Sequence, residues 1–373
     1  MAKLIDITGK CISGEWGQDD NEGIGIPVLR TTNFTNEGVI NYNSVVTRQI
    51  TKKDLSRKYL KMGDIIIEKS GGSDNQPVGR VVYFEGEENK YLFNNFTGVL
   101  RVLDRRQWLP KYIFYALFAN YQSGGTRSFE NKTTGLHNLK TDSYISSFKI
   151  AEITVEDQEI IVRKLDEIIY LISLRKQQLS KLDELVKSRF IELFGDPITN
   201  SKCLPTNNLG KVLLLKAGDF TAASDIAAEP TTENIYPCYG GNGIRGYVAE
   251  YNQEGSYSLI GRQGALSGNV QYATGKFKNT EHALLVTPLI EMNSIWLNHL
   301  LINLDLQRYQ TGAAQPGLSV KNLQEIPIIE VPKEDQNQFA AFVEQVDKSK
   351  LAIQRSLDRL ETLKKALMQK YFG

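Results

Sequence analysis

The chain has 373 residues, of which 41% are hydrophobic and 23% are charged, which is typical of a globular protein. It contains no apolar run near the roughly 20 residues that a membrane helix needs. The three cysteines are far apart, and the N-terminus lacks the apolar stretch of a signal peptide, so we expect a cytoplasmic protein without a structural metal site. The net charge of +1 means that nucleic-acid binding requires basic residues gathered on one face, or a partner that shares the phosphate contacts.

Residues 1–154 predict a mixed α/β domain. Short runs of β-branched and aromatic residues alternate with turns rich in glycine and asparagine. The pattern predicts strands over residues 63–68 and 79–84. A helix is expected over residues 110–120, where proline opens an apolar run.

Residues 155–195 predict one long helix. Acidic Glu156 and Asp157 begin it, Gly195 ends it, and the segment between contains no proline. At 1.5 Å per residue, such a helix is on the order of 57 Å long, which exceeds the need of a globular domain.

Residues 196–332 predict a second mixed α/β domain, and residues 333–373 predict a second long helix. The domain has expected strands over residues 257–260 and 282–286 and an expected helix over residues 294–304. The closing segment has the same length and the same acidic opening as the first long helix.

The two long helices are copies of one design. Glu156-Asp157-Gln158 recurs as Glu334-Asp335-Gln336, and Phe194-Gly195 recurs as Phe372-Gly373 at the same separation and without a gap. Repeats of this kind fix the architecture of a chain. The sequence therefore predicts a unit of one domain and one helix, written twice with a pseudo-two-fold relation.

Apolar residues follow a coiled-coil pattern in both helices, because they alternate spacings of four and three. Basic residues interrupt the pattern at different places, Arg175 and Arg189 in one helix and Lys350 and Lys364 in the other. We therefore expect an antiparallel coiled coil within the chain and an α+β fold overall. The expected seam residues are Ile161, Leu165, Ile168, Leu179 and Leu182 in the first helix and Val343, Val346, Ile353, Leu357 and Leu360 in the second.

The sequence contains no recognisable catalytic centre. It lacks a phosphate loop, a dinucleotide-binding glycine motif and the Asn-Pro-Pro-Tyr signature of amino methylation. His137, His282 and His299 lack nucleophile or metal partners in the sequence, so we interpret them as structural. These observations predict a binding protein rather than an enzyme.

Several strings of residues resemble one family. The first domain has Ile-Pro-Val-Leu-Arg-Thr-Thr-Asn-Phe at 26–34 and a glycine-bounded strand at 63–71 that is followed by Gly79-Arg80-Val81. The second has Tyr-Pro-Cys-Tyr-Gly-Gly-Asn-Gly-Ile at 236–244 and a strand that leads into Gly268-Asn269-Val270. With the repeated helices, essentially the whole chain resembles the specificity subunit of a type I restriction–modification system.

The resemblance implies a mechanism. Each domain would be a target-recognition domain that reads one half of a split site in double-stranded DNA, and the helix pair would set their separation. Two modification (methyltransferase) subunits would dock on the chain, and restriction subunits would join them. S-adenosylmethionine, ATP and Mg²⁺ would then belong to those partners, with no cofactor in this chain. A partner that both cuts and methylates is equally compatible with the sequence, and a coiled-coil scaffold for protein or carbohydrate is the alternative from another class.

Loops beside the glycine-rich strands carry side chains suited to base edges, since arginine pairs with guanine and asparagine or glutamine with adenine. The candidate DNA contacts are Thr31, Thr32, Asn33, Lys69, Ser70 and Arg80 in the first domain and Tyr239, Asn242, Arg245, Arg262 and Gln263 in the second. A structural role is the alternative: Asn33 and Asn242 would shape turns, and the arginines would pair with acids.

Overall fold

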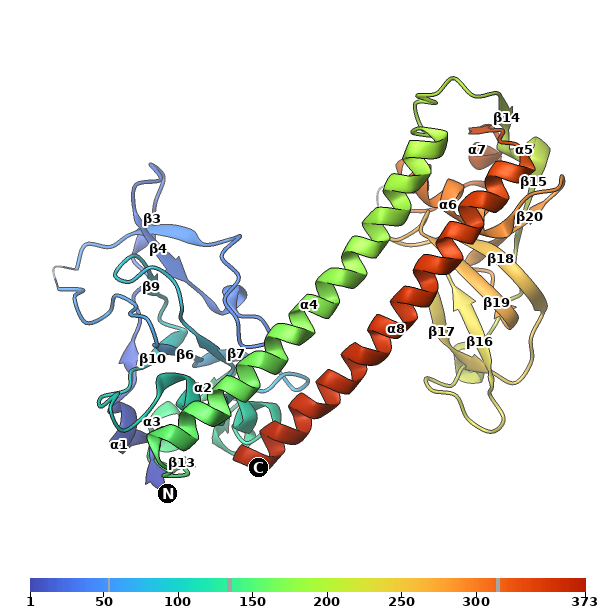
Figure 1. The fold of residues 1–373 in the computed structure, drawn as a ribbon. Coiled ribbons are helices and arrows are strands. Elements are labelled where there is room, and N and C mark those ends of the chain that lie inside the picture. Colours follow the sequence, from blue (N-terminus) through green and yellow to red (C-terminus); the bar gives the residue numbers. More distant parts are fainter. Residues whose placement is uncertain (53, 133–135, 313–315) are drawn as a thin grey trace. The chain divides into compact units, whose positions relative to one another are not determined.

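The computed structural model describes residues 1–52, 54–132, 136–312 and 316–373, which form two compact units. Unit 1 consists of Met1–Leu174 and Leu357–Gly373, and unit 2 consists of Arg175–Ser356. The boundary crosses the long helices α4 (Val155–Phe194) and α8 (Lys333–Phe372) near their middles, so each unit contains part of both. The four predicted segments instead divide the chain at the ends of these helices. The elements are labelled in Figure 1.

Unit 1 is built on a four-stranded antiparallel sheet of order β2-β10-β6-β8. A second sheet has the order β3-β5-β4-β9, and a third has the order β11-β12-β7. The strands are β1 (Ala2–Lys3), β2 (Ile12–Ser13), β3 (Gln18–Asp19), β4 (Ile26–Leu29), β5 (Val46–Gln49), β6 (Ile65–Glu68), β7 (Ser70–Gly72), β8 (Val81–Tyr83), β9 (Leu92–Phe93), β10 (Thr97–Leu100), β11 (Glu130–Asn131), β12 (His137–Leu139) and β13 (Lys149–Ile150). The helices are α1 (Leu4–Thr8), η1 (Thr31–Asn33), α2 (Pro110–Gln122), η2 (Arg127–Phe129) and α3 (Thr141–Ser147).

The core of unit 1 forms where α2 covers the central sheet. Helix α2 is apolar on most of its surface, so it is buried on several sides, as this composition requires. Ile161 and Leu165 from the start of α4 enter the same cluster as Met368 from the end of α8. The long helices are therefore part of this core.

Unit 2 is built on a six-stranded sheet of order β15-β20-β18-β19-β16-β17. The strands are β14 (Thr206–Asn208), β15 (Leu213–Ala217), β16 (Tyr236–Gly240), β17 (Gly243–Val248), β18 (Gln253–Gly261), β19 (Val270–Asn279), β20 (Ala283–Pro288) and β21 (Pro327–Ile329). The helices are α5 (Leu209–Val212), η3 (Ala223–Asp225), α6 (Ser294–Asn303), η4 (Leu306–Tyr309) and α7 (Val320–Gln324). All the strands and helices expected from the sequence are confirmed, with ends that differ by a few residues.

The core of unit 2 also includes both long helices. The ring of Phe339 on α8 lies 5.4 Å from that of Phe190 and 5.7 Å from that of Phe194 on α4. Farther along, Lys350 Nζ lies 2.6 Å from Asp183 Oδ1. Since the residue number rises along one helix as it falls along the other, the two helix segments of unit 2 run antiparallel.

The two units share one order of elements. In each, a short first strand pairs with the strand before the long helix, β1 with β13 and β14 with β21. The sheet order β2-β10-β6-β8 corresponds to β15-β20-β18-β19. A further strand pairs antiparallel on one side and parallel on the other, β4 in unit 1 and β16 in unit 2.

One buried glutamine makes equivalent contacts in each unit. Gln158 Oε1 accepts from the backbone N–H of Leu109 at the start of α2 (2.9 Å), and Gln336 Oε1 accepts from that of Asn293 at the start of α6 (2.8 Å). The side-chain amides donate to the carbonyls five residues earlier, Ile153 O and Val331 O. We call this pair of contacts the glutamine clasp; it fixes the start of each long helix to its domain.

The expected seam residues are buried or half-buried without exception. The basic interruptions are half-buried, and Lys350 reaches Asp183 while the Arg189 guanidinium lies 6.0 Å from the ring of Phe342. Long aliphatic stems allow such residues to line an apolar contact while their charges stay near water. Among the described residues, none of the helices is both long and apolar enough to cross a membrane.

Candidate nucleic-acid interface

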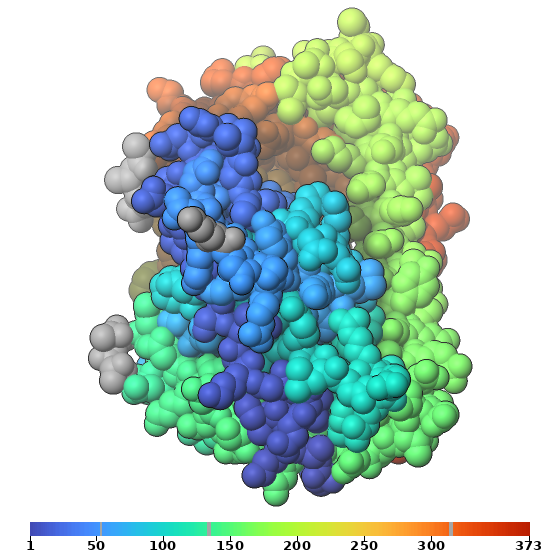
Figure 2. Space-filling model, turned by 90° about the vertical axis from the view of Figure 1, so that its left-hand side faces the viewer, coloured from blue at the N-terminus to red at the C-terminus, as the bar shows by residue number. Residues whose placement is uncertain are grey.

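In unit 1 the predicted contacts come together at the ends of three strands. Lys69 and Ser70 follow β6, and their backbone N–H groups donate to Phe96 O, before β10, at 2.8 and 3.2 Å. Leu139 N, at the end of β12, donates to Lys69 O at 2.8 Å. These bonds fix the backbone at Lys69, and its side chain is half-buried. Figure 2 views unit 1 from the side that its first hundred residues cover in blue and cyan.

Arg80 is a structural residue, which corrects its prediction as a base contact. Its Nη2 donates to Glu68 Oε1 at 3.0 Å and to Thr31 O at 3.1 Å, and its Nη1 donates to Phe34 O at 3.2 Å. Its side chain is 16% exposed, and that of Glu68 is 2% exposed. Burial raises the pKa of Glu68 above its ordinary value, although the Arg80 charge opposes the shift. Arg80 therefore ties the turn after β4 to the central sheet.

Asn33 is also structural. It is fully buried, its Oδ1 accepts from Arg30 N at 2.9 Å, and its Nδ2 donates to Asn41 O at 3.0 Å. These contacts match the structural alternative from the sequence, in which Asn33 shapes a turn. Thr31 is half-buried and Thr32 is exposed beside it, so of the three only the threonines present side chains to a ligand.

Unit 2 repeats this arrangement with different side chains. Arg262 follows β18 as Lys69 follows β6, its N–H donates to His282 O at 2.9 Å, and its carbonyl accepts from Leu318 N at 2.9 Å. These are the counterparts of the bonds between Lys69, Phe96 and Leu139. The two units thus place a basic residue on the same fixed backbone position at the end of the same strand.

The other predicted residues of unit 2 surround Arg262. Gln263 is exposed, and its Oε1 lies 3.0 Å from His282 Nδ1. Arg245 is exposed on β17. Tyr239 is half-buried, and its ring lies 5.4 Å from that of Phe277, so it serves mainly the packing of the sheet.

Asn242 has a partner that the sequence did not indicate. Asn269 Nδ2 donates to Asn242 Oδ1 at 2.8 Å, from a position just before β19. The only signal was the similarity of Gly268-Asn269-Val270 to Gly79-Arg80-Val81, because Asn269 occupies the place of Arg80 in the strand order.

The three histidines make structural contacts. His137 is buried with Nδ1 3.0 Å from Glu130 Oε2 and Nε2 3.5 Å from Asp74 Oδ1. A hydrogen bond from Lys132 holds the pKa of Asp74 below its ordinary value. His282 contacts Gln263, and His299 meets Phe339 edge to face with ring centroids 5.4 Å apart. Their roles agree with the structural interpretation from the sequence.

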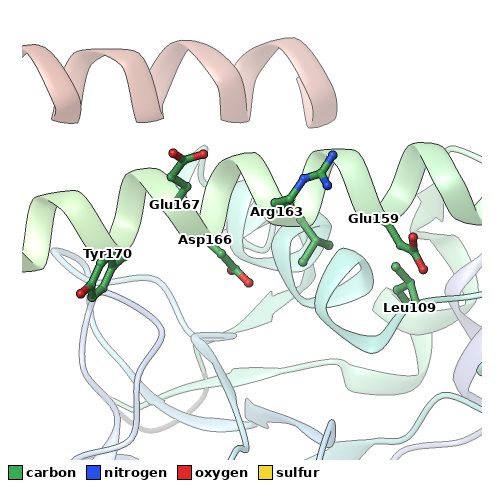
Figure 3. Close-up of a pocket in the computed structure, with 7 residues that line it drawn as sticks. Leu109, Glu159, Arg163, Asp166, Glu167 and Tyr170 are labelled. Carbon is green, nitrogen blue, oxygen red and sulfur yellow. The ribbon is translucent and has the colours of Figure 1, made fainter.

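A groove runs along the first half of α4 in unit 1. Figure 3 shows Glu159, Arg163, Asp166 and Tyr170 projecting from successive turns of this helix, with Leu109 at one end. Asp166 Oδ2 lies 3.1 Å from Lys111 Nζ, and Asp166 Oδ1 also accepts from Tyr115 Oη. Burial raises the pKa of Tyr115, so its hydroxyl remains a donor. Tyr170 and Arg163 are exposed here, and tyrosine and arginine are enriched at protein interfaces.

Comparisons with known proteins agree on one family. The family model described as "Type I restriction modification DNA specificity domain" matches residues 1–184 and 207–364. A relative from Escherichia coli, the type I restriction enzyme EcoprrI specificity subunit, is 39% identical over 176 residues, which cover 47% of this chain and 42% of that protein. The chain thus matches less than half the length of this curated relative.

Two solved structures have a similar fold. The S subunit of a type I restriction–modification system from M. genitalium matches with a TM-score of 0.61 and 17% identity, over 100% of this chain and 95% of that chain. A chain from a structure on the assembly and conformational transition of a type I R-M system matches with a TM-score of 0.56 and 17% identity, over 100% of this chain and 96% of that chain. At this identity the likeness is one of fold.

Proposed function

Because the chain belongs to the family of type I restriction–modification DNA specificity domains, we propose that it is the DNA-reading subunit of such a complex and that each unit reads one half of a split target. Membership of a family of specificity domains supports a role in recognition rather than catalysis, and it does not favour the scaffold alternative. The shared geometry of Lys69 and Arg262 carries the proposal of two readers, since both units present a cation from the same fixed strand end.

The long helices act as a spacer in this proposal. Each has 40 residues and is therefore about 60 Å long. One turn of duplex DNA is about 34–36 Å. The buried seam, the glutamine clasp in each unit and the antiparallel segments of unit 2 support an antiparallel coiled coil with pseudo-two-fold repetition. A rigid pair of this kind holds two half-sites at a set distance.

Partner subunits complete the complex. Two modification subunits dock on the helices and domains, and the groove on α4 with its exposed Tyr170 is one candidate surface for a dock. Restriction subunits join this assembly. S-adenosylmethionine, ATP and Mg²⁺ act in those partners, and this chain contributes the sequence readout. The complex acts on DNA in the cytoplasm.

DNA selection tests the proposal. The full chain, alone and with modification subunits of the same system, is incubated with randomised duplexes, and the bound DNA is sequenced. We expect two conserved blocks separated by a spacer of fixed length and free sequence. A bound pool without sequence preference, or with one continuous block, contradicts the proposal.

Arg262→Ala separates base reading from phosphate binding. The backbone at Arg262 is fixed by two hydrogen bonds, so the variant keeps the loop. We expect it to relax preference at one base pair of one block, by about 1–3 kcal/mol, and to leave the other block unchanged. Lys69→Ala is the matched variant in unit 1. An equal loss for all sequences would identify a phosphate contact instead.

A further inference from the structure

Two asparagine side chains in unit 2 share one hydrogen bond and keep complementary groups for a ligand. Asn269 Nδ2 donates to Asn242 Oδ1 at 2.8 Å. Asn242 is exposed and Asn269 is half-buried. Within the described ranges, Asn242 Nδ2 and Asn269 Oδ1 have no protein partner. The two bonded amides therefore keep one donor and one carbonyl acceptor for a ligand.

The backbone beneath the pair is closely packed. A Cβ on Gly261 would lie 2.1 Å from Gly241 O, so the turn that carries Asn242 presses on the end of β18. Gly261 N donates to Asn269 O, and Gly268 N donates to Gly261 O, both at 2.8 Å. Gly268 has a φ of +93°, which a side chain would strain. Such packing holds both amides in place before a ligand arrives, which lowers the ordering cost of binding.

Adenine is the base that matches this donor–acceptor pair. Its major-groove edge presents the N7 acceptor and the N6 amino donor, whereas guanine presents two acceptors, N7 and O6. We propose that Asn242 Nδ2 donates to N7 and Asn269 Oδ1 accepts from N6 of one adenine in the half-site of unit 2. Guanine at that position would set its O6 against Asn269 Oδ1. The inference rests on the proposed function and names the chemistry of one contact in it.

Exposed aliphatic residues lie close to both asparagines in sequence. Ile244 follows Asn242 and is 53% exposed, and Leu266 lies in the loop before Asn269 and is 47% exposed. Apolar side chains contact the thymine methyl group in the major groove. Exposed aliphatic side chains on the loops that carry the amide pair suit an A·T base pair and its neighbours.

Unit 1 does not repeat this reader. Arg80 holds the position of Asn269, but its guanidinium is bonded to Thr31 O, Phe34 O and Glu68. The corresponding turn of unit 1 is therefore held by the bonds of Arg80 to other residues of the chain. The asparagine pair is specific to the half-site of unit 2, and unit 1 provides an internal control.

Base analogues test the contact atom by atom. The full chain with its modification subunits is bound to the duplex that the wild type selects, with each adenine replaced in turn by 7-deazaadenine, which lacks N7, or by purine, which lacks the N6 amino group. At one position we expect each analogue to weaken wild-type binding roughly 5- to 150-fold. Asn242→Ala should bind the 7-deaza duplex and the natural duplex equally, and Asn269→Ala should do so with the purine duplex.

The outcomes separate this inference from the proposed function. If the wild type selects no sequence, the proposed function itself fails. If it selects a split site but each analogue weakens variant and wild type by the same factor, the asparagine contact is wrong and the proposed function stands. An equal loss of affinity for all duplexes in both variants also overturns the contact. Gln177→Ala, exposed on α4 and outside the candidate DNA contacts, is the control, and it should leave the response to both analogues unchanged.

Discussion

Two buried amides in this chain, Gln158 and Asn33, bond only backbone, whereas the exposed Asn242 bonds another amide side chain. Gln158 and Asn33 have no exposed surface, and all their bonds go to main-chain groups. Asn242 is exposed and bonds only another side chain. For these three residues, burial separates the amides that hold backbone from the one that we propose to contact DNA.

Removal of the glutamine clasp should destabilise the domain to which it belongs. Gln158→Ala leaves Leu109 N–H and two carbonyls without their partner in a buried place. We expect the free energy of unfolding to fall by about 1–3 kcal/mol, and by a similar amount for Gln336→Ala in unit 2. Urea denaturation followed by circular dichroism measures the change. Gln177→Ala on the exposed face of α4 is the control, and an equal effect there would refute the role of the clasp.

His299 should make unit 2 less stable in acid. Burial lowers the pKa of His299 from its ordinary 6.5 to about 4. Between these values the unfolded chain binds a proton that the folded chain does not, so stability falls as the pH drops from 6.5 towards 4. We expect His299→Phe, which keeps an aromatic ring beside Phe339, to reduce this loss by on the order of 1–3 kcal/mol. Urea denaturation at pH 7 and pH 5 measures this loss of stability in the wild type and the variant. An identical pH dependence in the two would contradict the role given to His299.

The sequence predicted where the candidate loops lie in the fold better than it predicted which of their side chains face outward. Glycine-bounded strands located the turns that carry Thr32, Lys69 and Arg262. The side chain of Arg80 points inward because it bonds the buried Glu68, and this contact forms only in the tertiary structure. Asn269 was missed because its significance comes from Asn242, 27 residues away.

At the scale of elements, length and local signals decided what could be predicted. The long helices begin and end within about a residue of their predicted limits, because their sequences contain acidic starts, glycine stops and no proline. Gly195 indeed has a φ of +76°, the conformation that ends helices at glycine. Two-residue strands such as β2 and β3 carry no periodic signal, since their pairing depends on distant strands.

Longer helices should lengthen the spacer between the half-sites. One extra heptad in both α4 and α8, placed near Arg175 and near Leu357, keeps the seam in register. It adds about 10 Å, close to the length of three base pairs. DNA selection should recover the same two blocks with a longer spacer. Altered blocks would refute the ruler, and a heptad in only one helix is the control that should impair folding.

At the scale of the whole molecule, the charge is nearly balanced. With 44 basic and 43 acidic residues, the chain has little general attraction for phosphate. Lys69 and Arg262 are local cations at the predicted reading ends. Composition alone therefore does not predict DNA binding. That prediction came from the repeated helices and the loop motifs.

Salt dependence should reveal how much of the phosphate contact partners supply. Binding of the selected duplex is measured by fluorescence anisotropy from low to high salt, for the chain alone and with modification subunits. Each added phosphate contact steepens the plot of log K against log salt by about 0.9. We expect a shallow slope for the chain alone and a clearly steeper slope for the complex. Equal slopes would show that this chain makes the phosphate contacts itself.

The division of both long helices between the units affects the order in which the protein can fold during synthesis. Unit 2 is one continuous segment, Arg175–Ser356, whereas unit 1 needs Leu357–Gly373 as well as the first 174 residues. Met368 and Phe372 from that late segment pack against Ile161, Leu165 and Tyr112. During synthesis, the core of unit 1 therefore stays incomplete until unit 2 has emerged from the ribosome and Leu357–Gly373 has followed it.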